Sequence, residues 1–290
     1  MEHAQKDIPI MLRVHSSCRW LEDTLDMISN QTVATKVYAY CCTPTDELRS
    51  LLSPYVEHIY TISQETYETW GFLNRSMEMT EAELVVFLDG ECTPVDVHWL
   101  AKLLEPFRSD RVGAAFSRML PASDAGILIM NDLARVFDEQ GDLFAENHRH
   151  YFSSFAAACR RSLWQSDPFP VEEYGSWASF VWSWQARRRG VEISYAKHAR
   201  VLYTRSYALR SVCARGRESG RAEANIFSWE PKEITLRSYA LKPAGMQIRE
   251  DLRQAWRMRQ PAVLLYAPLV RLCFCLCKYR SFRRTYARRR

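Results

Sequence analysis

Residues 83–94 of the chain read ELVVFLDGECTP. Residues 84–88 are apolar and rich in β-branched and aromatic types, which predicts a strand buried on both faces. Asp89 and Glu91 follow on either side of a glycine, and Pro94 ends the pairing of the strand. Ligands of open α/β sheets bind at the carboxyl ends of strands, where these two acids would lie. They could share one Mg²⁺ or Mn²⁺, which favour carboxylate oxygens, or they could form a solvated acidic turn.

The composition is that of a globular protein, with 290 residues, 47% hydrophobic and 25% charged. The length suits one large α/β domain with an appendage. No apolar run approaches the roughly 18–20 uncharged residues of a spanning helix, and the start of the chain carries no signal-peptide pattern. The nine cysteines are odd in number and lack a framework spacing, so we expect reduced thiols and a cytoplasmic protein.

Short apolar runs and helical patterns alternate along the chain. Alternation of this kind predicts parallel strand pairing with right-handed crossovers. The predicted strands are residues 8–14, 36–40, 58–62, 84–88, 112–116 and 191–195, and the main predicted helices are 20–28, 48–55, 97–107 and 177–189.

Four segments around the central run carry a family resemblance. They are LNR at 73–75, WLAKLLEPF at 99–107, VGA at 112–114 with Arg118 and Pro121 after it, and FSSFAAACRRSLW at 152–164. Their succession resembles the inverting family-2 glycosyltransferases, particularly the bacterial rhamnosyltransferase-like members, over roughly residues 8–207. The resemblance implies a GT-A fold, an α/β architecture whose Rossmann-like, mostly parallel sheet is flanked by helices. We expect this domain at residues 1–228 and a helical C-terminal extension at 229–290.

The resemblance also implies an activity. Its members transfer a sugar from a nucleotide-diphosphate donor, here to a saccharide or lipid-linked acceptor in cell-surface polysaccharide synthesis. Asp89 and Glu91 stand at the family's Asp-x-Asp motif, so they are the expected ligands of a divalent cation, Mn or Mg. Arg13, at the end of the first strand, is expected to meet a phosphate, and Asn74 belongs to the "LN" element of the donor site.

The nucleotide pocket departs from the family pattern. Tyr40 stands where the family has an Asp that faces the base, and Asp46 is the residue that could cover the later acid of that turn. Tyr40 could stack on a base or be a buried strand residue. Arg217 belongs to a series of arginines between 205 and 221 that could neutralise phosphate or form a solvated helix face.

The position of the catalytic base departs further. The family carries Glu-Asp at the start of the helix where this chain has Ala178 and Ser179, and neither accepts a proton at neutral pH. Glu172 and Glu173, a few residues upstream, are the nearest carboxylates and are taken as the candidate catalytic pair. The alternative is a non-catalytic glycosyltransferase-like protein that acts as a binding or scaffolding subunit.

The C-terminal region combines an apolar segment with a basic tail. Residues 262–274 are apolar, but Pro268 and Arg271 interrupt them, so we expect a segment too short and too broken to span a membrane. Residues 278–290 contain seven Lys or Arg and no acid. This order predicts a peripheral contact with the cytoplasmic face of the inner membrane, the alternative being a helix packed on the domain. No nucleic-acid-binding module is recognisable, so no nucleic-acid partner is expected.

Overall fold

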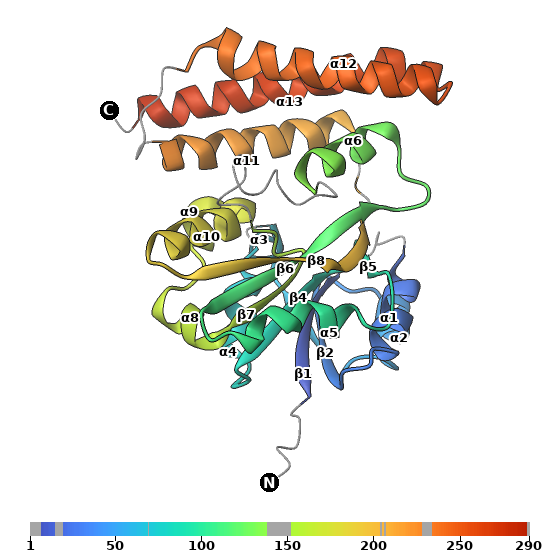
Figure 1. Ribbon diagram of the computed structural model, residues 1–290, viewed down its shortest axis with the longest axis vertical. Coiled ribbons are helices and arrows are strands. Elements are labelled where there is room, and N and C mark those ends of the chain that lie inside the picture. Colours follow the sequence, from blue (N-terminus) through green and yellow to red (C-terminus); the bar gives the residue numbers. More distant parts are fainter. Residues whose placement is uncertain are drawn as a thin grey trace. The chain divides into compact units, whose positions relative to one another are not determined.

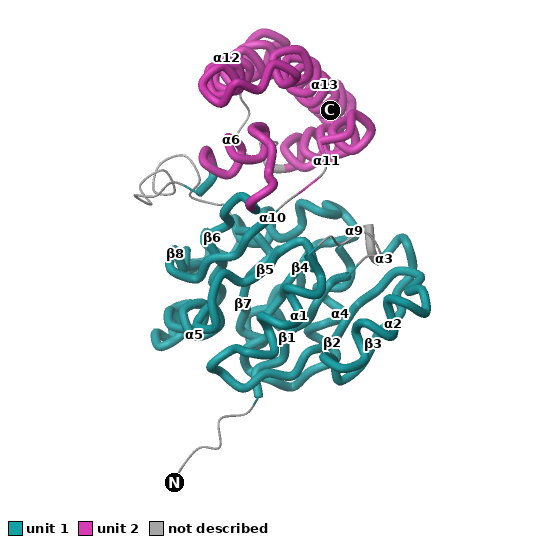
Figure 2. Tube along the Cα trace, turned by 90° about the vertical axis from the view of Figure 1, so that its right-hand side faces the viewer, with its two compact units in different colours: residues 1–122, 136–204 teal, residues 123–135, 205–290 magenta. Residues whose placement is uncertain are grey.

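The computed structural model describes residues 7–14, 20–68, 70–137, 152–203, 205, 207–227 and 234–288. The chain divides into two compact units, shown in different colours in Figure 2. Unit 1 comprises residues 1–122 and 136–204, and unit 2 comprises residues 123–135 and 205–290. Residues 138–151 lie outside the described residues.

Unit 1 is built on a single eight-stranded mixed sheet in the order β3-β2-β1-β4-β7-β6-β8-β5 (Figure 1). Pairing is parallel for β1 with β2 and β4, for β2 with β3, and for β6 with β8. It is antiparallel for β7 with β4 and β6, and for β5 with β8. The predicted α/β fold with a mostly parallel sheet is therefore confirmed. The strands are β1 Ile8–Val14, β2 Thr35–Cys42, β3 His58–Ile62, β4 Leu84–Asp89, β5 Cys92–Pro94, β6 Val112–Pro121, β7 Ala156–Arg160 and β8 Glu192–Tyr203.

The centre of this sheet is the predicted strand at 84–88. Val85, Val86, Phe87 and Leu88 are all completely buried, as expected for a strand covered on both faces. The helices of the unit are α1 Leu21–Ser29, α2 Asp46–Leu52, α3 Gln64–Glu68, α4 Phe72–Glu78, α5 Trp99–Leu104, α8 Arg161–Ser166, α9 Val171–Tyr174 and α10 Ala178–Arg188, with short 3-10 turns η1 Glu105–Arg108 and η2 Gly175–Trp177. β8 runs eight residues beyond the predicted end at residue 195, because β6 also extends to Pro121 and supplies partners for it.

Unit 2 is helical. Its elements are α6 Ile127–Val136, whose last residue is assigned to unit 1, α11 Leu209–Phe227, the π-helical turn η3 Arg237–Leu241, α12 Lys242–Arg257 and α13 Pro261–Ala287. α11 and α13 pack closely where α11 has glycine. A Cβ atom on Gly216 would lie 2.7 Å from the Phe274 carbonyl oxygen, and one on Gly220 would lie 2.1 Å from that of Lys278. α11 and α13 belong to the same unit. The expected domain division at residue 228 stays a prediction.

A buried ion-pair network joins α6, α12 and α13 inside unit 2. Arg271, with 5% of its side chain exposed, donates from Nε to Asp251 Oδ2 at 2.6 Å and from Nη1 to Asp132 Oδ1 at 2.7 Å. Its Nη2 also donates to the Leu128 carbonyl oxygen at 3.1 Å. Burial acts to raise the pKa of Asp132, but the charges of Arg205 and Arg271 outweigh that effect and the pKa is lowered. Paired and hydrogen-bonded in this way, the buried charges fix the three helices in one arrangement.

The C-terminal segment differs from the expectation. Residues 261–287 form one helix of 27 residues that continues through Pro268, and by length and composition it is apolar enough to cross a membrane. The prediction that the segment is too short and too broken was therefore wrong. It treated Arg271 as an interruption, whereas two carboxylates neutralise that residue within the unit.

Candidate active site

The carboxyl ends of β1 and β4 bring an arginine and an aspartate together in unit 1. The two strands are parallel neighbours, and their register places Arg13 opposite Asp89. Arg13 Nη1 lies 2.7 Å from Asp89 Oδ2, while Oδ1 accepts the backbone N–H of Glu91 at 3.0 Å. Asp89 has 1% of its side chain exposed, so the ion pair compensates a buried charge.

Arg13 is held in place by aromatic residues that the sequence did not single out. Its guanidinium carbon lies 4.3 Å from the centre of the Trp70 ring, within the range of a cation–π contact. Trp70 packs edge-on against Phe155 at 4.7 Å and has a φ of +62°, which is uncommon for a residue other than glycine. The Phe155 carbonyl oxygen accepts the backbone N–H of Asp89 at 2.7 Å. Strained backbone of this kind is frequent at functional sites.

Glu91 completes the predicted acidic motif in the turn between β4 and β5. Its side chain is half-buried, and the preceding Gly90 N–H donates to the Arg13 carbonyl oxygen at 2.8 Å, which ties the turn to β1. Asp89 and Glu91 supply two carboxylates from one turn, the ligand type that Mg²⁺ and Mn²⁺ prefer, although both Asp89 oxygens are bonded within the protein. Within the described residues no group of three or more His, Cys, Asp or Glu side chains gathers.

The two residues predicted for the nucleotide base have different environments. Tyr40 is completely buried on β2, and its ring stacks on Tyr60 with centroids 5.0 Å apart. Burial raises the pKa of Tyr40 to about 12. Of the two interpretations of this tyrosine, the geometry favours a core strand residue. Asp46 is exposed in the first turn of α2, directly after the Thr45 side chain that accepts the Leu48 N–H.

Asn74 holds a loop. Its Oδ1 accepts the Trp164 indole N–H at 2.9 Å and the Phe169 backbone N–H at 3.0 Å, and its Nδ2 donates to the Phe169 carbonyl oxygen at 2.8 Å. These three bonds fix the segment that leads into α9. The "LN" element therefore positions a loop of the unit, and its predicted contact with the donor stays a prediction.

The candidate base residues lie on α9, and the family's usual base position lies at the start of α10. Glu172 and Glu173 are both exposed on α9. Ala178 is completely buried and Ser179 is 7% exposed, which leaves the family's usual base position within the protein core. Both the assignment of the family's base position to Ala178 and Ser179 and the choice of either glutamate as base stay predictions.

Arg217 belongs to unit 2, where it lies exposed on α11 and its carbonyl oxygen accepts the Ser281 hydroxyl at 2.6 Å. Its predicted contact with phosphate stays a prediction. The residues that the structure does bring together are thus Arg13, Asp89 and Glu91, with Trp70 as the addition. In the sequence, Trp70 stands directly before a glycine and the "LN" element, and this position is the signal by which it could have been identified.

Comparison with known proteins places this geometry in context. The chain is 25% identical over 187 residues to the O-antigen chain rhamnosyltransferase WbaN of Salmonella anatum. The match covers 61% of this chain and 58% of WbaN, so it spans less than two thirds of that relative. No protein-family model matches the chain.

Solved structures resemble the chain at low sequence identity. The mannosyltransferase PcManGT from Pyrobaculum calidifontis, in complex with GDP-Man and Mn²⁺, matches with a TM-score of 0.62 and 14% identity over 95% of this chain and 86% of its own. Glucosyl-3-phosphoglycerate synthase from Mycobacterium tuberculosis, in complex with Mn²⁺, UDP-Glc and phosphoglyceric acid, matches with a TM-score of 0.54 and 15% identity over 77% and 79%. The chain therefore has a GT-A-like fold and is distantly similar in sequence to WbaN.

Proposed function

We propose that this chain transfers a sugar from a nucleotide-diphosphate donor to a saccharide or lipid-linked acceptor in cell-surface polysaccharide synthesis. The observation that carries the proposal is the Arg13–Asp89 pair with Glu91 at the carboxyl end of β4, where α/β sheets bind ligands. Support comes from the sequence similarity to WbaN and from the GDP-Man and UDP-Glc in the similar structures.

Each residue of the site has a proposed role. Asp89 and Glu91 would hold a divalent cation, which supplies charge neutralisation of the departing diphosphate. Arg13 holds the Asp89 carboxylate in one orientation and adds a fixed positive charge beside it. Glu172 or Glu173 would accept the proton of the acceptor hydroxyl.

Binding of a nucleotide diphosphate to the full chain tests the proposal. Calorimetric titration with GDP and with UDP in the presence of Mn²⁺ should show saturable binding of at least one of them. Loss of a cation ligand in Asp89→Ala should weaken that Mn²⁺-dependent binding by at least about 100-fold. Asp110→Ala is the matched control, because Asp110 is fully exposed on the same unit. Unchanged affinity of Asp89→Ala, with its fold intact by circular dichroism, would remove the metal-site proposal.

The second candidate is a non-catalytic binding or scaffolding subunit. Buried Ala178 and Ser179 at the usual base position and a core Tyr40 favour it. Nucleotide-sugar hydrolysis in the presence of Mn²⁺ separates the two candidates. An active chain should hydrolyse its donor slowly in the absence of acceptor, whereas a binding subunit should leave every donor intact.

We further propose that unit 2 contacts the cytoplasmic face of the inner membrane as a peripheral surface. Leu265, Leu269 and Leu272 are 84%, 47% and 37% exposed, and their spacing puts them on one face of α13. The same face continues with exposed Arg280, and exposed Arg283 follows one turn later. An apolar face followed by basic side chains suits an anionic bilayer surface.

A further inference from the structure

We propose that unit 1 carries a binding site for a diphosphate-type polyanion, in a cavity between α5, β6 and β8. The cavity has a volume of about 380 Å³ and is lined by Lys102, Arg118, Lys197, His198 and Arg200. Every lining side chain is basic. This site goes beyond the proposed sugar transfer, because neither Asp89 nor Glu91 lines it.

An irregularity of β8 creates the cavity. Ser117 of β6 pairs with Ala196, but the next residue, Arg118, pairs with Arg200, so residues 197–199 have no partners on β6. Successive residues of a regular strand point to opposite faces of the sheet. The bulge breaks this alternation and brings residues 197, 198 and 200 to one cavity, while Ala199 is completely buried. Bulges re-aim side chains in this way and are frequent next to binding sites.

The lining of the cavity is rich in positive charge. Arg118 and Arg200 stand opposite each other on the parallel strands β6 and β8, directly after the bulge. Lys102 Nζ lies 2.9 Å from Asp96 Oδ2. This hydrogen bond, together with the charge of Arg200, lowers the pKa of Asp96. The lining thus carries four fixed cations, of which Lys102 is paired with Asp96. An oxyanion with several negative charges suits a lining of this kind.

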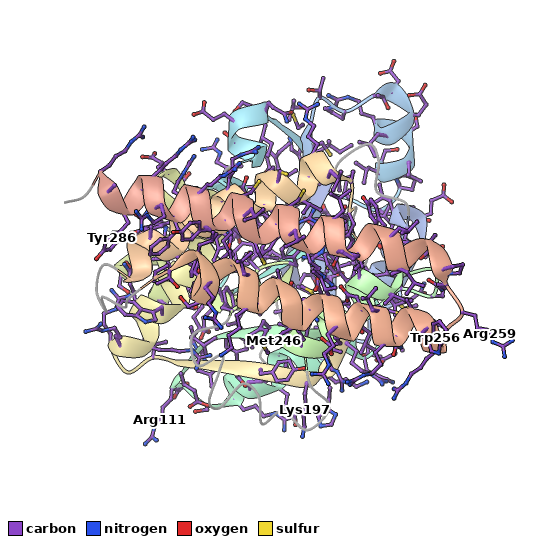
Figure 3. All side chains as sticks on the ribbon, turned by 90° about the horizontal axis from the view of Figure 1, so that it is seen from above. Arg111, Lys197, Met246, Trp256, Arg259 and Tyr286 are labelled. Atoms are coloured by element: carbon purple, nitrogen blue, oxygen red, sulfur yellow. The ribbon has the colours of Figure 1, made fainter. Side chains whose placement is uncertain are left out.

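Chemistry and size favour a diphosphate over a single carboxylate. Arginine guanidinium groups bind phosphate oxygens through two parallel hydrogen bonds, and two arginines line the cavity. The site is open to solvent, because Lys197 and Arg200 are exposed, and Figure 3 shows Lys197 projecting outward from unit 1. The Val95 N–H donates to the Arg200 carbonyl oxygen at 3.0 Å. Val95 directly follows β5, the strand after Glu91, so this hydrogen bond connects the cavity to that strand.

Titration of the full chain with inorganic pyrophosphate tests the site. EDTA in the buffer excludes any cation at Asp89 and Glu91, so failure of the proposed sugar transfer leaves this test unaffected. We expect saturable binding by the wild type and a loss of at least roughly tenfold in Lys197→Ala/Arg200→Ala, since hydrogen bonds to charged groups are strong. Arg108→Ala/Arg111→Ala removes the same charge from exposed positions of the same unit and should change the affinity by less than about twofold.

Two results would overturn the proposal. One is equal weakening of pyrophosphate binding by both double variants, or the absence of saturable binding by the wild type. Either outcome would mean that the cavity attracts anions only through an adventitious charge effect. The other concerns the source of the phosphate, tested with phosphatidylcholine vesicles containing phosphatidylglycerol. If Lys197→Ala/Arg200→Ala loses vesicle binding but keeps pyrophosphate binding, the cavity binds a membrane surface and not a soluble diphosphate.

Discussion

Asp89 keeps one orientation because three neighbours bond it. Arg13 bonds one carboxylate oxygen, the Glu91 N–H bonds the other, and the Phe155 carbonyl oxygen accepts its backbone N–H. The aromatic contact of Arg13 with Trp70 restrains the guanidinium in turn. A site whose side chains are fixed before the ligand arrives loses little free energy to reorganisation when it binds an anion.

Whether the chain acts as an enzyme depends on which residue is the catalytic base. Glu172→Gln/Glu173→Gln keeps the size of both exposed side chains but removes both proton acceptors. Because general-base assistance is worth about 10²–10⁴ in rate, we expect sugar transfer to slow at least about 100-fold while donor affinity stays nearly constant. Transfer from a panel of nucleotide-diphosphate sugars that includes GDP-mannose and UDP-glucose measures the rate.

The matched control for the base is Glu57→Gln/Glu81→Gln, which removes two exposed carboxylates elsewhere in unit 1. Its turnover should equal that of the wild type. If the α9 double variant also keeps wild-type turnover, neither glutamate is the base. Absence of binding by every donor would leave the non-catalytic subunit as the better description.

Secondary-structure elements show which features local sequence can and cannot predict. The apolar run before Asp89 was sufficient to identify β4, and its central place in the sheet follows from its complete burial. The bulge in β8 interrupts the apolar pattern after residue 195, so the second half of the strand could not be identified without its partner β6. The same holds for Arg271, which looks like a helix interruption until its carboxylate partners on α6 and α12 are known.

The candidate site divides in the same way. Asp89 and Glu91 were identifiable because they directly follow a strand, but the bond from Arg13 depends on strand order and register. The burial of Tyr40 and the loop contacts of Asn74 depend on residues distant in sequence, such as Phe169. Local motifs therefore predicted which residues lie at the carboxyl ends of β1 and β4, and tertiary packing determined what each of them contacts.

Helix packing in unit 2 gives a prediction at the level of elements. Gly220→Ala would place a Cβ atom 2.1 Å from the Lys278 carbonyl oxygen, so α11 and α13 must separate. We expect the free energy of unfolding to fall by about 1–3 kcal/mol or more, as for other overpacked contacts. Urea unfolding followed by circular dichroism measures the change.

Gly245→Ala is the control, because nothing lies within 4 Å of the Cβ atom it would add to α12. It should raise the free energy of unfolding by about 0.4–1 kcal/mol through the lower entropy of the unfolded chain. Equal stability of Gly220→Ala and the wild type would contradict the close packing of α11 on α13.

At the scale of the whole molecule, the two units carry different kinds of surface. Unit 1 contains the Arg13–Asp89 site and the basic cavity of β8. Unit 2 exposes large apolar side chains on α12 and α13, among them Trp256 at 79% and Leu265 at 84%. An exposed apolar surface of this kind marks an interaction site, and the neighbouring arginines favour an anionic lipid surface as the partner.

Flotation of the full chain with lipid vesicles tests this membrane contact. We expect binding to vesicles that contain phosphatidylglycerol and partial release at about 1 M NaCl, where the Debye length is about 3 Å. Leu265→Gln/Leu269→Gln should weaken binding at least about tenfold, because each leucine contributes roughly 1.5 kcal/mol on entering the bilayer. Met79→Gln/Val97→Gln changes two exposed apolar residues of unit 1 and should bind as the wild type does.

A second experiment decides how α13 meets the membrane. The helix is long and apolar enough to cross a bilayer, yet Arg271 near its middle is buried against Asp132 and Asp251. Crossing would expose those charges to hydrocarbon unless the network moved with the helix, and charged residues there are costly. We therefore expect alkaline washing to release the protein from cell membranes. Retention after that wash would show that α13 crosses the bilayer, and failure to float with any vesicle would contradict the proposed membrane contact.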